Sequence, residues 1–218
     1  MRILILGTTG RTGCYLLSQA SKAGYNVNVL VRDKNRLKVD PGLFTVFEGN
    51  ATNKAELLAA MQNCDAILSA LNISRKSDFP WAKLRTSENF LSASMKNIIE
   101  VATALNIQRV IITSAWGVAE TKKNIPWWFR FLIDHSNIGY AYRDHERQEE
   151  LLKNSNLNWT AVRPVGLTNS TKEKDTLVSL DNSPKPNLTI SRQNLARFMI
   201  RVLKEGMYVR QSPAVSDK

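Results

Sequence analysis

The feature that most constrains this chain is a glycine-rich turn, Gly7-Thr8-Thr9-Gly10-Arg11-Thr12-Gly13, which lies between a strand pattern and a helix pattern. Before it, residues 2–6 form an apolar, branched run that is typical of a buried parallel strand. After it, apolar residues recur at helical spacing over residues 16–23 and stop at Gly24, which favours a helix end. A second apolar run follows over residues 26–31. A strand, a glycine turn, a helix and a strand in this order predict a dinucleotide-binding unit.

Each glycine of the turn has its own physical reason. Gly7 lets the chain leave the strand sharply, Gly10 lets the backbone approach a pyrophosphate, and Gly13 lets the helix pack close to the sheet. The pyrophosphate would then meet free N–H groups and the positive end of the helix dipole. A glycine pattern alone is weak, since tight turns use the same residues, but its place between strand and helix favours a cofactor site. The predicted contacts in this loop are Gly7, Thr9, Gly10, Arg11, Thr12 and Gly13.

The end of the second predicted strand indicates which dinucleotide is bound. An NAD site normally has an Asp or Glu there to hold the ribose hydroxyls, whereas this chain has Arg32. Arg11 in the turn and Arg36 add two more cations, and guanidinium groups bind phosphate through paired hydrogen bonds. Asp33 is the one competing acid, one residue past the usual position. We therefore expect the 2′-phosphate of NADP(H) to be bound by Arg32, with Arg36 and Arg11 assisting.

The composition predicts one domain over residues 1–218, because 218 residues with 43% hydrophobic content suffice for a well-filled core and no linker-like run or repeat divides them. No apolar run is long enough to span a bilayer, and the N-terminus lacks a signal-peptide pattern. Buried free thiols in a reducing compartment explain Cys14 and Cys64 better than a disulfide or a metal site does. We therefore expect a cytoplasmic protein without a metal.

The net charge of +11 could indicate a nucleic-acid partner, since basic surfaces attract phosphate backbones. The cations are scattered along the chain, however, without a basic arm or a recognisable nucleic-acid-binding module. Part of the excess belongs to the expected cofactor site. We therefore expect no specific nucleic-acid partner.

The rest of the chain alternates strand and helix patterns, which predicts the α/β class and a Rossmann-type doubly wound parallel sheet. Further strands are expected at residues 43–47, 65–70, 109–113 and 158–162, and helices at residues 53–62, 84–105, 142–154 and 193–204. Thr52 and Ser191 are the expected N-caps of the helices that follow them. The final dozen residues are expected to form a small edge strand or a tail.

An aromatic run over residues 125–133, Ile-Pro-Trp-Trp-Phe-Arg-Phe-Leu-Ile, interrupts this alternation. It could be a membrane-surface anchor, but it is short and contains a single Arg, so packing over the sheet edge or beside a substrate cleft is favoured. Trp116, Trp127 and Trp128 could stack on a flat substrate ring, although core and edge packing is the more frequent use of such residues. We therefore expect no membrane contact.

Three polar residues are candidates for chemistry. Ser114, just after the fifth predicted strand, could orient a substrate carbonyl or the nicotinamide amide, or could be a small residue that tight packing requires. His145 has an ordinary pKa near neutrality, but it lies in the charged stretch 143–147, where a solvated helix face is favoured. His135 has no partner signal. Ser114 is the residue kept as the catalytic candidate.

Together these features resemble the atypical short-chain dehydrogenase/reductase superfamily, and within it the NAD(P)H-binding branch that contains the biliverdin IXβ/flavin reductases and NmrA-like proteins. The glycine turn alone is common to many proteins. The Arg-Pro pair after the sixth strand and the Ser191–Met199 ending are more specific to this branch. The resemblance covers nearly the whole chain and rests on Gly7–Gly13, Val31-Arg32-Asp33 with Arg36, Thr113-Ser114-Ala115, Asp144-His145, 151–157, Arg163-Pro164 and 191–199.

The resemblance implies where further parts of the cofactor lie. In this branch the backbone after the sixth strand lines the nicotinamide, which implies Pro164, Val165 and Gly166 there, with Thr113 and Ser114 beside the reacting ring. The family usually has Gly-Asp at the end of the third strand where this chain has Gly-Asn, and an amide can still bond the adenine amine. The residues implied near the adenine are Asn50, Ala51, Ala70 and Leu71.

Two departures from the family bear on the reaction. Short-chain dehydrogenases typically use Tyr-x-x-x-Lys, but at that spacing Tyr140 is followed by Asp144 and Tyr142 by Glu146. The histidine that other biliverdin-type reductases have just after the strand-six proline is replaced by Val165-Gly166. Alcohol dehydrogenation or sugar epimerisation by the tyrosine mechanism is therefore not expected.

What remains is the activity that the resemblance implies, an NADPH-dependent reductase that passes hydride to a flat conjugated small-molecule acceptor such as a flavin, a quinone or a tetrapyrrole. The cofactor would supply the chemistry and solvent the proton. The alternative is an NADP(H)-binding redox sensor or scaffold without turnover, which would lack the Tyr–Lys pair equally. We expect a monomer or a weak homo-oligomer.

Overall fold

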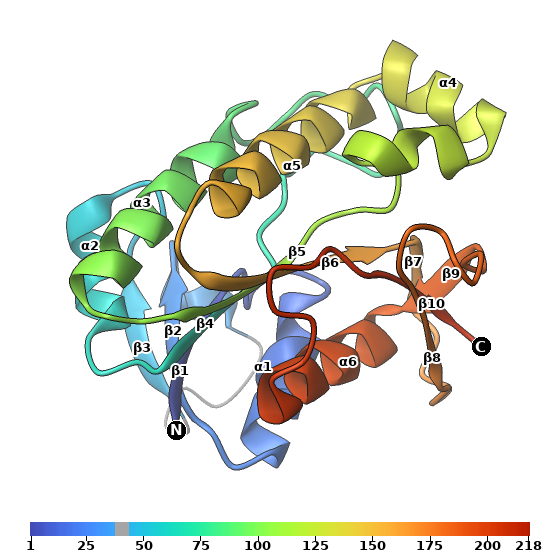
Figure 1. Cartoon of the computed structure of the whole chain (residues 1–218). Helices are drawn as coiled ribbons and strands as arrows, with labels where there is room; N and C mark the ends of the chain where they lie inside the picture. Colours follow the sequence, from blue (N-terminus) through green and yellow to red (C-terminus); the bar gives the residue numbers. More distant parts are fainter. Residues whose placement is uncertain (38–43) are drawn as a thin grey trace.

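The computed structural model describes residues 1–37 and 44–218, and at its centre is an eight-stranded sheet in the order β3-β2-β1-β4-β5-β6-β10-β8 (Figure 1). Neighbouring strands pair in parallel except β10 and β8, which pair antiparallel. These strands are β1 (Arg2–Leu6), β2 (Asn26–Val31), β3 (Thr45–Glu48), β4 (Ala66–Ser69), β5 (Arg109–Thr113), β6 (Asn158–Pro164), β8 (Thr176–Ser179) and β10 (Ala214–Asp217). The order 3-2-1-4-5-6 is that of a doubly wound Rossmann sheet, so the predicted fold class is confirmed.

Helices cover both faces of this sheet, and a small parallel pair of strands, β7 (Gly166–Thr168) and β9 (Thr189–Ser191), lies beside it. Figure 1 shows α2, α3 and α5 on one face and α1 and α6 on the other. The helices are α1 (Gly13–Lys22), α2 (Lys54–Met61), α3 (Phe90–Ala104), α4 (Trp127–His135), α5 (Ile138–Lys153) and α6 (Arg192–Glu205), with the short 3-10 turns η1 (Lys34–Arg36) and η3 (Ala119–Asn124).

The core has two halves because side chains of a strand alternate between the faces of the sheet. In β1, Ile3 and Ile5 pack with α1 and α6, whereas Leu4 and Leu6 pack with α2 and α3. All four side chains are buried, and burying a side chain of this size stabilises the fold by about 1.5–3 kcal/mol. The continuous apolar run that predicted this strand therefore reflects burial on both faces.

Two helix starts show how local polar chemistry sets boundaries. Ser191 is the N-cap of α6, as expected, and its hydroxyl accepts from the N–H of Asn194 at 3.1 Å. The expectation that Thr52 caps α2 is wrong. The N-cap is Asn53, whose side chain accepts hydrogen bonds from the N–H groups of the first turn. Asn53 has the extended backbone that an N-cap needs, whereas the N–H of Thr52 donates to the side chain of Asn50 in the preceding turn.

The third helix begins later than its apolar pattern predicts. α3 starts at Phe90 rather than at residue 84, because Leu84 forms a β-bridge with Arg75 and the N–H of Arg85 donates to the carbonyl of Ser74. The predicted strand over residues 43–47 is observed as Thr45–Glu48, and residue 43 lies outside the described residues.

The C-terminal residues form neither an edge strand nor a tail. β10 lies inside the sheet, parallel to β6 and antiparallel to β8, and its residues are buried. The partner on its outer side, β8, comes from a polar segment that carried no strand pattern. The sheet therefore extends two strands past β6, and the loop that returns to β10 runs along β6 (Figure 1).

Candidate functional site

A cleft of about 450 Å³ lies at the carboxyl ends of β1, β2 and β4, where the strand order reverses. Parallel α/β sheets bind ligands at this switch point, because the loops of adjacent strands diverge there. Its volume is within the range of small-molecule sites. The lining segments are the glycine turn (6–12), the end of β2 with η1 (30–32 and 36), the loop after β3 (49–51), the loop after β4 (70–75, 77 and 78), Thr86 and Phe90 before and in α3, and Leu167 and Arg192.

The glycine turn is built too tightly for side chains at its two ends. Gly7 has a φ of +83°, and a Cβ there would lie 2.7 Å from the carbonyl oxygen of Ala70. A Cβ on Gly13 would lie 2.0 Å from the carbonyl oxygen of Gly7, so this glycine sets how closely α1 packs on the turn. At Gly10 a Cβ would lie 3.1 Å from the carbonyl oxygen of Gly7 and φ is not positive, and Gly10 itself lines the cleft.

The same turn presents polar groups that suit a pyrophosphate. The hydroxyl of Thr8 is buried and has no hydrogen-bond partner among the described residues. Within the described part of the chain, the N–H groups of Thr9, Arg11 and Thr12 donate to no backbone carbonyl. They lie at the N-terminus of α1, whose dipole is positive there. Unused donors at a positive helix end fit the pyrophosphate of a dinucleotide.

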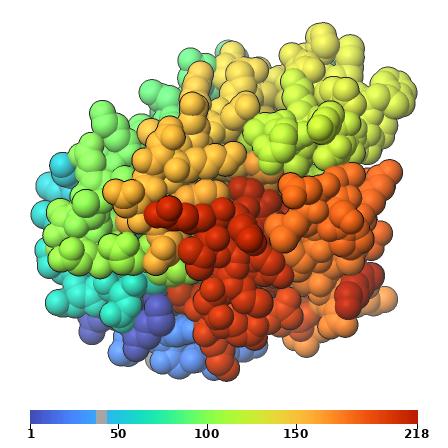
Figure 2. All heavy atoms as spheres, viewed as in Figure 1, coloured from blue at the N-terminus to red at the C-terminus, as the bar shows by residue number. Residues whose placement is uncertain are grey.

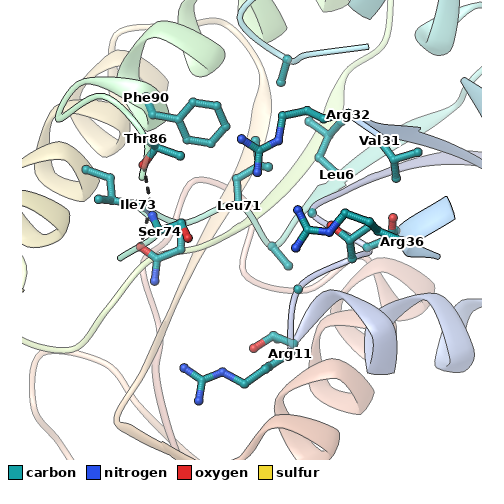
Figure 3. Close-up of a pocket in the computed structure, with 18 of the residues that line it drawn as sticks. Leu6, Arg11, Val31, Arg32, Arg36, Leu71, Ile73, Ser74, Thr86 and Phe90 are labelled. Atoms are coloured by element: carbon teal, nitrogen blue, oxygen red, sulfur yellow. Dashed lines mark hydrogen bonds between the residues drawn. The ribbon is translucent and has the colours of Figure 1, made fainter. Parts of the chain in front are cut away.

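The three arginines that were expected to bind the 2′-phosphate do not all point to the same place in the cleft. Figure 3 shows Arg32 and Arg36 pointing into the cleft, while Arg11 extends away from Arg36. Arg11 forms a bidentate ion pair with Asp78, in which its two terminal nitrogens lie 2.7 and 2.9 Å from the carboxylate oxygens. These hydrogen bonds hold the pKa of Asp78 below its usual value. The structure thus places Arg32 and Arg36 together and Arg11 on the opposite rim, beside the loop that follows β4.

Asp33, the acid next to Arg32, forms a cap for η1 and does not face the cleft. The carboxylate of Asp33 accepts from the N–H of Asn35 at 3.0 Å and so caps η1. Asp33 does not line the cleft, whereas its neighbour Arg32 does. The cleft therefore meets a guanidinium at the end of β2.

Sequence reasoning missed Arg192, a cation in the cleft wall. Its Nη1 donates to the side-chain oxygen of Asn169 at 2.7 Å and to the carbonyl of Leu167 at 3.3 Å. Burial lowers the pKa of Arg192, and the nearby Arg11 lowers it further. Arg192 is the first residue of α6, and only the distant loop after β7 brings it to the cleft, so no local pattern could have identified it.

The residues implied near the adenine line the cleft, whereas those implied near the nicotinamide do not. Asn50, Ala51, Ala70 and Leu71 face it together with the glycine turn. The hydroxyl of Thr113 donates to the carbonyl of Ser69 at 3.1 Å, between two strand ends. The remaining residues that lie outside the lining are Gly13, Ser114, Pro164, Val165 and Gly166.

Ser114 belongs to a buried polar network. Its hydroxyl donates to Glu149 at 2.5 Å, and Glu149 also receives two hydrogen bonds from Arg163, at 2.6 and 3.0 Å. Arg163 is 1% exposed and also binds Glu120. Burial alone would lower the pKa of Arg163, but the hydrogen bonds to Glu149 and Glu120 outweigh it and raise the pKa. The Ser114 hydroxyl is thus part of a buried network of charged groups that links β5, β6 and α5.

The expectation of a solvated face around His145 is wrong. Asp144, His145, Gln148 and Glu149 are all buried on the inner side of α5. Burial lowers the pKa of His145 to about 4, so the ring is neutral at pH 7, and its Nδ1 lies 2.8 Å from the Gln148 amide. Burial also raises the pKa of the Tyr142 phenol. None of these residues lines the cleft.

Asp144 caps a neighbouring helix rather than taking part in a site. Its carboxylate accepts from the N–H of Leu91 at 2.6 Å and from the hydroxyl of Ser92 at 2.5 Å, at the start of α3. The N-cap residue of α3, Asn89, makes no side-chain cap of its own. Asp144 thus has a structural role in the packing between α3 and α5.

The aromatic run forms α4, and its outer residues neither pack on the sheet edge nor wall the cleft. Trp127, Trp128 and Phe131 are exposed, whereas Trp116 is buried. Within the described residues there is no group of three or more side chains that could hold a metal ion. The two cysteines are free, and burial raises the pKa of Cys64 to about 11. No helix in the described ranges is long and apolar enough to cross a membrane.

The fold and the cleft together define a dinucleotide-binding protein of the Rossmann class. A model of the NAD(P)H-binding family matches residues 7–206, and the chain belongs to this family. The resemblance drawn from the sequence is confirmed at this level. The match includes the glycine turn, the basic end of β2 and α6.

Two curated relatives align along nearly the whole chain. Photosystem II assembly factor Ycf39 from Synechocystis sp. is 24% identical over 227 residues, which cover 100% of this chain and 63% of the relative. Oxidoreductase nsrR from Aspergillus novofumigatus is 25% identical, covering 97% of this chain and 82% of the relative. The chain therefore spans less than two thirds of the Ycf39 protein.

Solved structures show the same fold at low sequence identity. ChuY, an anaerobillin reductase from Escherichia coli O157:H7, superposes with a TM-score of 0.82 at 16% identity, covering 100% of this chain and 97% of ChuY. A short-chain dehydrogenase/reductase from Veillonella parvula in complex with NADP has a TM-score of 0.80 at 21% identity, covering 99% and 94%.

Proposed function

We propose that this protein is an NADPH-dependent reductase that transfers hydride to a flat conjugated small molecule of the flavin, quinone or tetrapyrrole type. The observation that carries the proposal is the cofactor cleft, whose lining includes the glycine turn, Arg32 and Arg36. The polar groups around the ends of β5 and β6 then limit the class of acceptor. The Ser114 hydroxyl is bound to Glu149, His145 is buried and neutral, and burial raises the pKa of Tyr142. A conjugated acceptor is the class that these groups suit, because it needs little help from an acid.

The electron balance of this reaction is simple. NADPH supplies the hydride and becomes NADP⁺, the acceptor gains two electrons, and solvent supplies the proton that completes its reduction. The chain binds and orients both molecules and excludes water from the reacting faces. ChuY, which has the same fold, is an anaerobillin reductase, and this supports an acceptor of this kind.

The preference for NADP(H) over NAD(H) rests on Arg32 and Arg36. Both line the cleft, and a 2′-phosphate takes charge-assisted hydrogen bonds from guanidinium groups. Asp33, which could hold the ribose hydroxyls of NAD, caps η1 and does not line the cleft. The NADP-bound relative from Veillonella parvula supports the same choice.

The test is acceptor-dependent loss of NADPH absorbance with flavin mononucleotide, menadione and biliverdin, each offered to the purified protein. We expect at least one acceptor to be reduced in proportion to enzyme concentration. The matched control is Gly10→Val, which fills the cofactor side of the turn and should abolish the rate with every acceptor.

The alternative, a redox sensor that binds NADP(H) without turnover, makes the opposite prediction in the same assay. The buried Ser114 network and the neutral His145 suit a binding protein as well as a reductase. Tight NADPH binding by titration, with no consumption in the presence of any acceptor, would replace the reductase with the sensor.

A further inference from the structure

Five large aromatic side chains are exposed in two neighbouring segments. On α4, Trp127, Trp128 and Phe131 are 78%, 51% and 55% exposed. Before α3, Phe79 and Trp81 are 62% and 48% exposed. Exposed apolar residues are common one at a time, whereas a group of this size marks an interaction surface. We call these five residues the aromatic patch.

Contacts between the two segments bring Phe79 and Trp81 next to Phe131 of α4. The rings of Phe79 and Trp81 lie 5.3 Å apart, and the indole N–H of Trp81 donates to the carbonyl of His135 at 2.9 Å. The His135 ring in turn stacks on Phe131 at 4.2 Å. Asn137 adds a hydrogen bond to the carbonyl of Trp81 at 2.9 Å. The aromatic residues of the loop and of α4 are thereby held side by side.

The patch is flanked by cations. The N–H of Lys76 donates to the carbonyl of Lys83 at 2.9 Å, so the two residues are paired across the base of the loop that carries Phe79 and Trp81. Lys76, Lys83 and Arg85 are exposed, and none of them has an ion pair within the described ranges. The acids of these segments, Asp78 and Asp134, are each neutralised by a basic partner.

The shape of this region is convex. Figure 1 shows α4 at one end of the molecule, away from the sheet, and in the space-filling view of Figure 2 the same segment stands out at a corner. A protruding helix and loop suit insertion into a soft surface. The lysines beside the patch, which form no ion pair among the described residues, add positive charge that complements an anionic surface.

We propose that the aromatic patch docks this protein onto the surface of an anionic lipid membrane. Tryptophan side chains favour the boundary between lipid headgroups and acyl chains, because the ring is apolar and the N–H is polar. Lysines beside them gain from the negative potential of anionic headgroups. The net charge of +11 adds a long-range attraction of the same sign.

In the fold, the aromatic run of α4 lies beside a second aromatic segment, which favours a membrane contact more than the sequence did. In the sequence the aromatic run is short and holds one Arg, which argued against a membrane anchor. In the fold, residues 76–85 lie beside α4 and bring two more aromatic side chains and three more cations. The patch is therefore assembled from two segments about 45 residues apart.

Docking by this surface would place the cleft near the membrane. Ser77 and Asp78 line the cleft and immediately precede Phe79, which belongs to the patch. An acceptor dissolved in the lipid would then enter from the same side. The membrane contact itself does not depend on any redox activity, so the two proposals can fail separately.

The test is co-sedimentation of the purified full chain with vesicles of phosphatidylcholine containing about one third phosphatidylserine, compared with pure phosphatidylcholine. We expect strong partitioning to the anionic vesicles, weaker partitioning to the neutral ones, and a marked loss as salt is raised, because salt screens the lysines.

Two sets of variants identify the surface. The triple variant Trp127→Ala, Trp128→Ala and Phe131→Ala should reduce the partition coefficient by roughly tenfold or more. A tenfold change corresponds to about 1.4 kcal/mol, and the free energy of burying one aromatic side chain exceeds that value. Lys76→Glu and Lys83→Glu should each reduce it by about fivefold or more. Titration with NADPH and circular dichroism check that each variant is folded.

Matched controls remove similar groups elsewhere. Leu188→Ala with Val209→Ala deletes exposed apolar side chains outside the patch, and Lys22→Glu with Lys204→Glu reverses charges on α1 and α6, on the other face of the sheet. Each apolar control should partition like the wild type, and the charge control should show only the general loss from lower net charge.

Three outcomes would overturn the proposal. The first is no sedimentation with either kind of vesicle. The second is binding that the triple aromatic variant leaves unchanged, which would assign the contact to charge alone. The third is a dimer in solution that the triple variant converts to a monomer, which would make a second copy of the chain the occupant of the patch.

Discussion

Arg32 and Asp33 are neighbours in the sequence, but the structure turns their side chains to different uses. Arg32 faces the cleft, and Asp33 accepts a hydrogen bond from the N–H of Asn35. A carboxylate held in a cap is poorly placed to bind two ribose hydroxyls, whereas a guanidinium at the strand end suits a phosphate. We therefore propose that single side chains at this point set the preference between the two nicotinamide dinucleotides.

The first prediction follows from that arrangement. Arg32→Glu should weaken NADPH binding by about tenfold or more, because a hydrogen bond to a charged group contributes about 1.5–3 kcal/mol. NADH binding should change far less. Lys34→Glu is the matched control, since Lys34 is exposed on η1 but does not line the cleft. Titrations that show equal losses for both cofactors would contradict the role given to Arg32.

The second prediction separates two glycines that look equivalent in the sequence. Gly13→Ala should destabilise the fold strongly, because its Cβ would lie 2.0 Å from the carbonyl oxygen of Gly7 and no side chain can move aside. Gly10→Val should leave folding largely intact and abolish NADPH binding, since the added atoms occupy the cleft side of the turn. Thermal unfolding followed by circular dichroism measures the first effect, and titration measures the second. Normal binding by Gly10→Val would mean that the turn does not hold the pyrophosphate.

Local patterns predicted the glycine turn and the N-cap of α6, because the partners of these residues lie within a few positions. They did not predict Arg192 or the direction of Arg11, because Asn169 and Asp78 reach these arginines only through the fold. Side chains whose partners are distant in the sequence are the ones that sequence reasoning placed incorrectly or missed.

At the level of whole elements, α5 shows the same limit. Its sequence over residues 143–147 is charged, which predicted a solvated face, yet Asp144, His145, Gln148 and Glu149 point inward. They share one face because residues three to five positions apart lie together on a helix. Asp144 and Glu149 find partners at the start of α3 and at Arg163 of β6, which a helix pattern alone does not reveal.

The third prediction concerns the link between α5 and α3. Asp144→Ala should lower the free energy of unfolding by about 1–3 kcal/mol, because buried N–H groups at the start of α3 lose their acceptor. Asp144→Asn keeps an oxygen at that place and should cost less. Urea unfolding measures both variants. If the alanine variant is as stable as the wild type, the hydrogen bonds from Leu91 and Ser92 do not support α3.

The fourth prediction is a dependence of stability on pH through His145. Its pKa is about 4 in the fold against 6.5 for an unperturbed histidine, so between these pH values the unfolded chain binds a proton that the folded chain does not. The stabilisation from the neutral ring is complete above pH 6.5 and is lost as pH falls toward 4, by up to about 3 kcal/mol.

The measurement is urea unfolding of the wild type and of His145→Gln across this range of pH. The variant should have a flatter profile between pH 6.5 and 4, and the difference between the two proteins removes the contribution of the carboxylates that titrate in both. Parallel profiles would mean that the pKa of His145 is the same in the folded and unfolded states.

For the molecule as a whole, alternation of strand and helix was sufficient to predict the doubly wound sheet from β1 to β6. Parallel strands that are buried on both faces leave long apolar runs, and these runs are hard to mistake. The strand β8 escaped prediction, and β10 was expected only as an edge strand or a tail, because both strands are short and pair with segments far away in the chain. The aromatic patch could not be predicted for the same reason, since it combines residues from two regions of the sequence.

The walls of the cleft come from β1, β2, the loop after β4, α3 and α6, so a bound dinucleotide should stabilise the entire fold and not one loop. NADPH at about 100 times its dissociation constant should raise the free energy of unfolding by about 2.7 kcal/mol. For a chain of this size, each kcal/mol raises Tm by about 2–4 °C. NADH at the same concentration, bound about tenfold more weakly, should contribute about 1.4 kcal/mol.

Thermal melts with each cofactor test this, with Gly10→Val as the control that should respond to neither. Equal shifts for NADH and NADPH would remove the preference for the 2′-phosphate, and a full shift in Gly10→Val would place the cofactor outside this cleft.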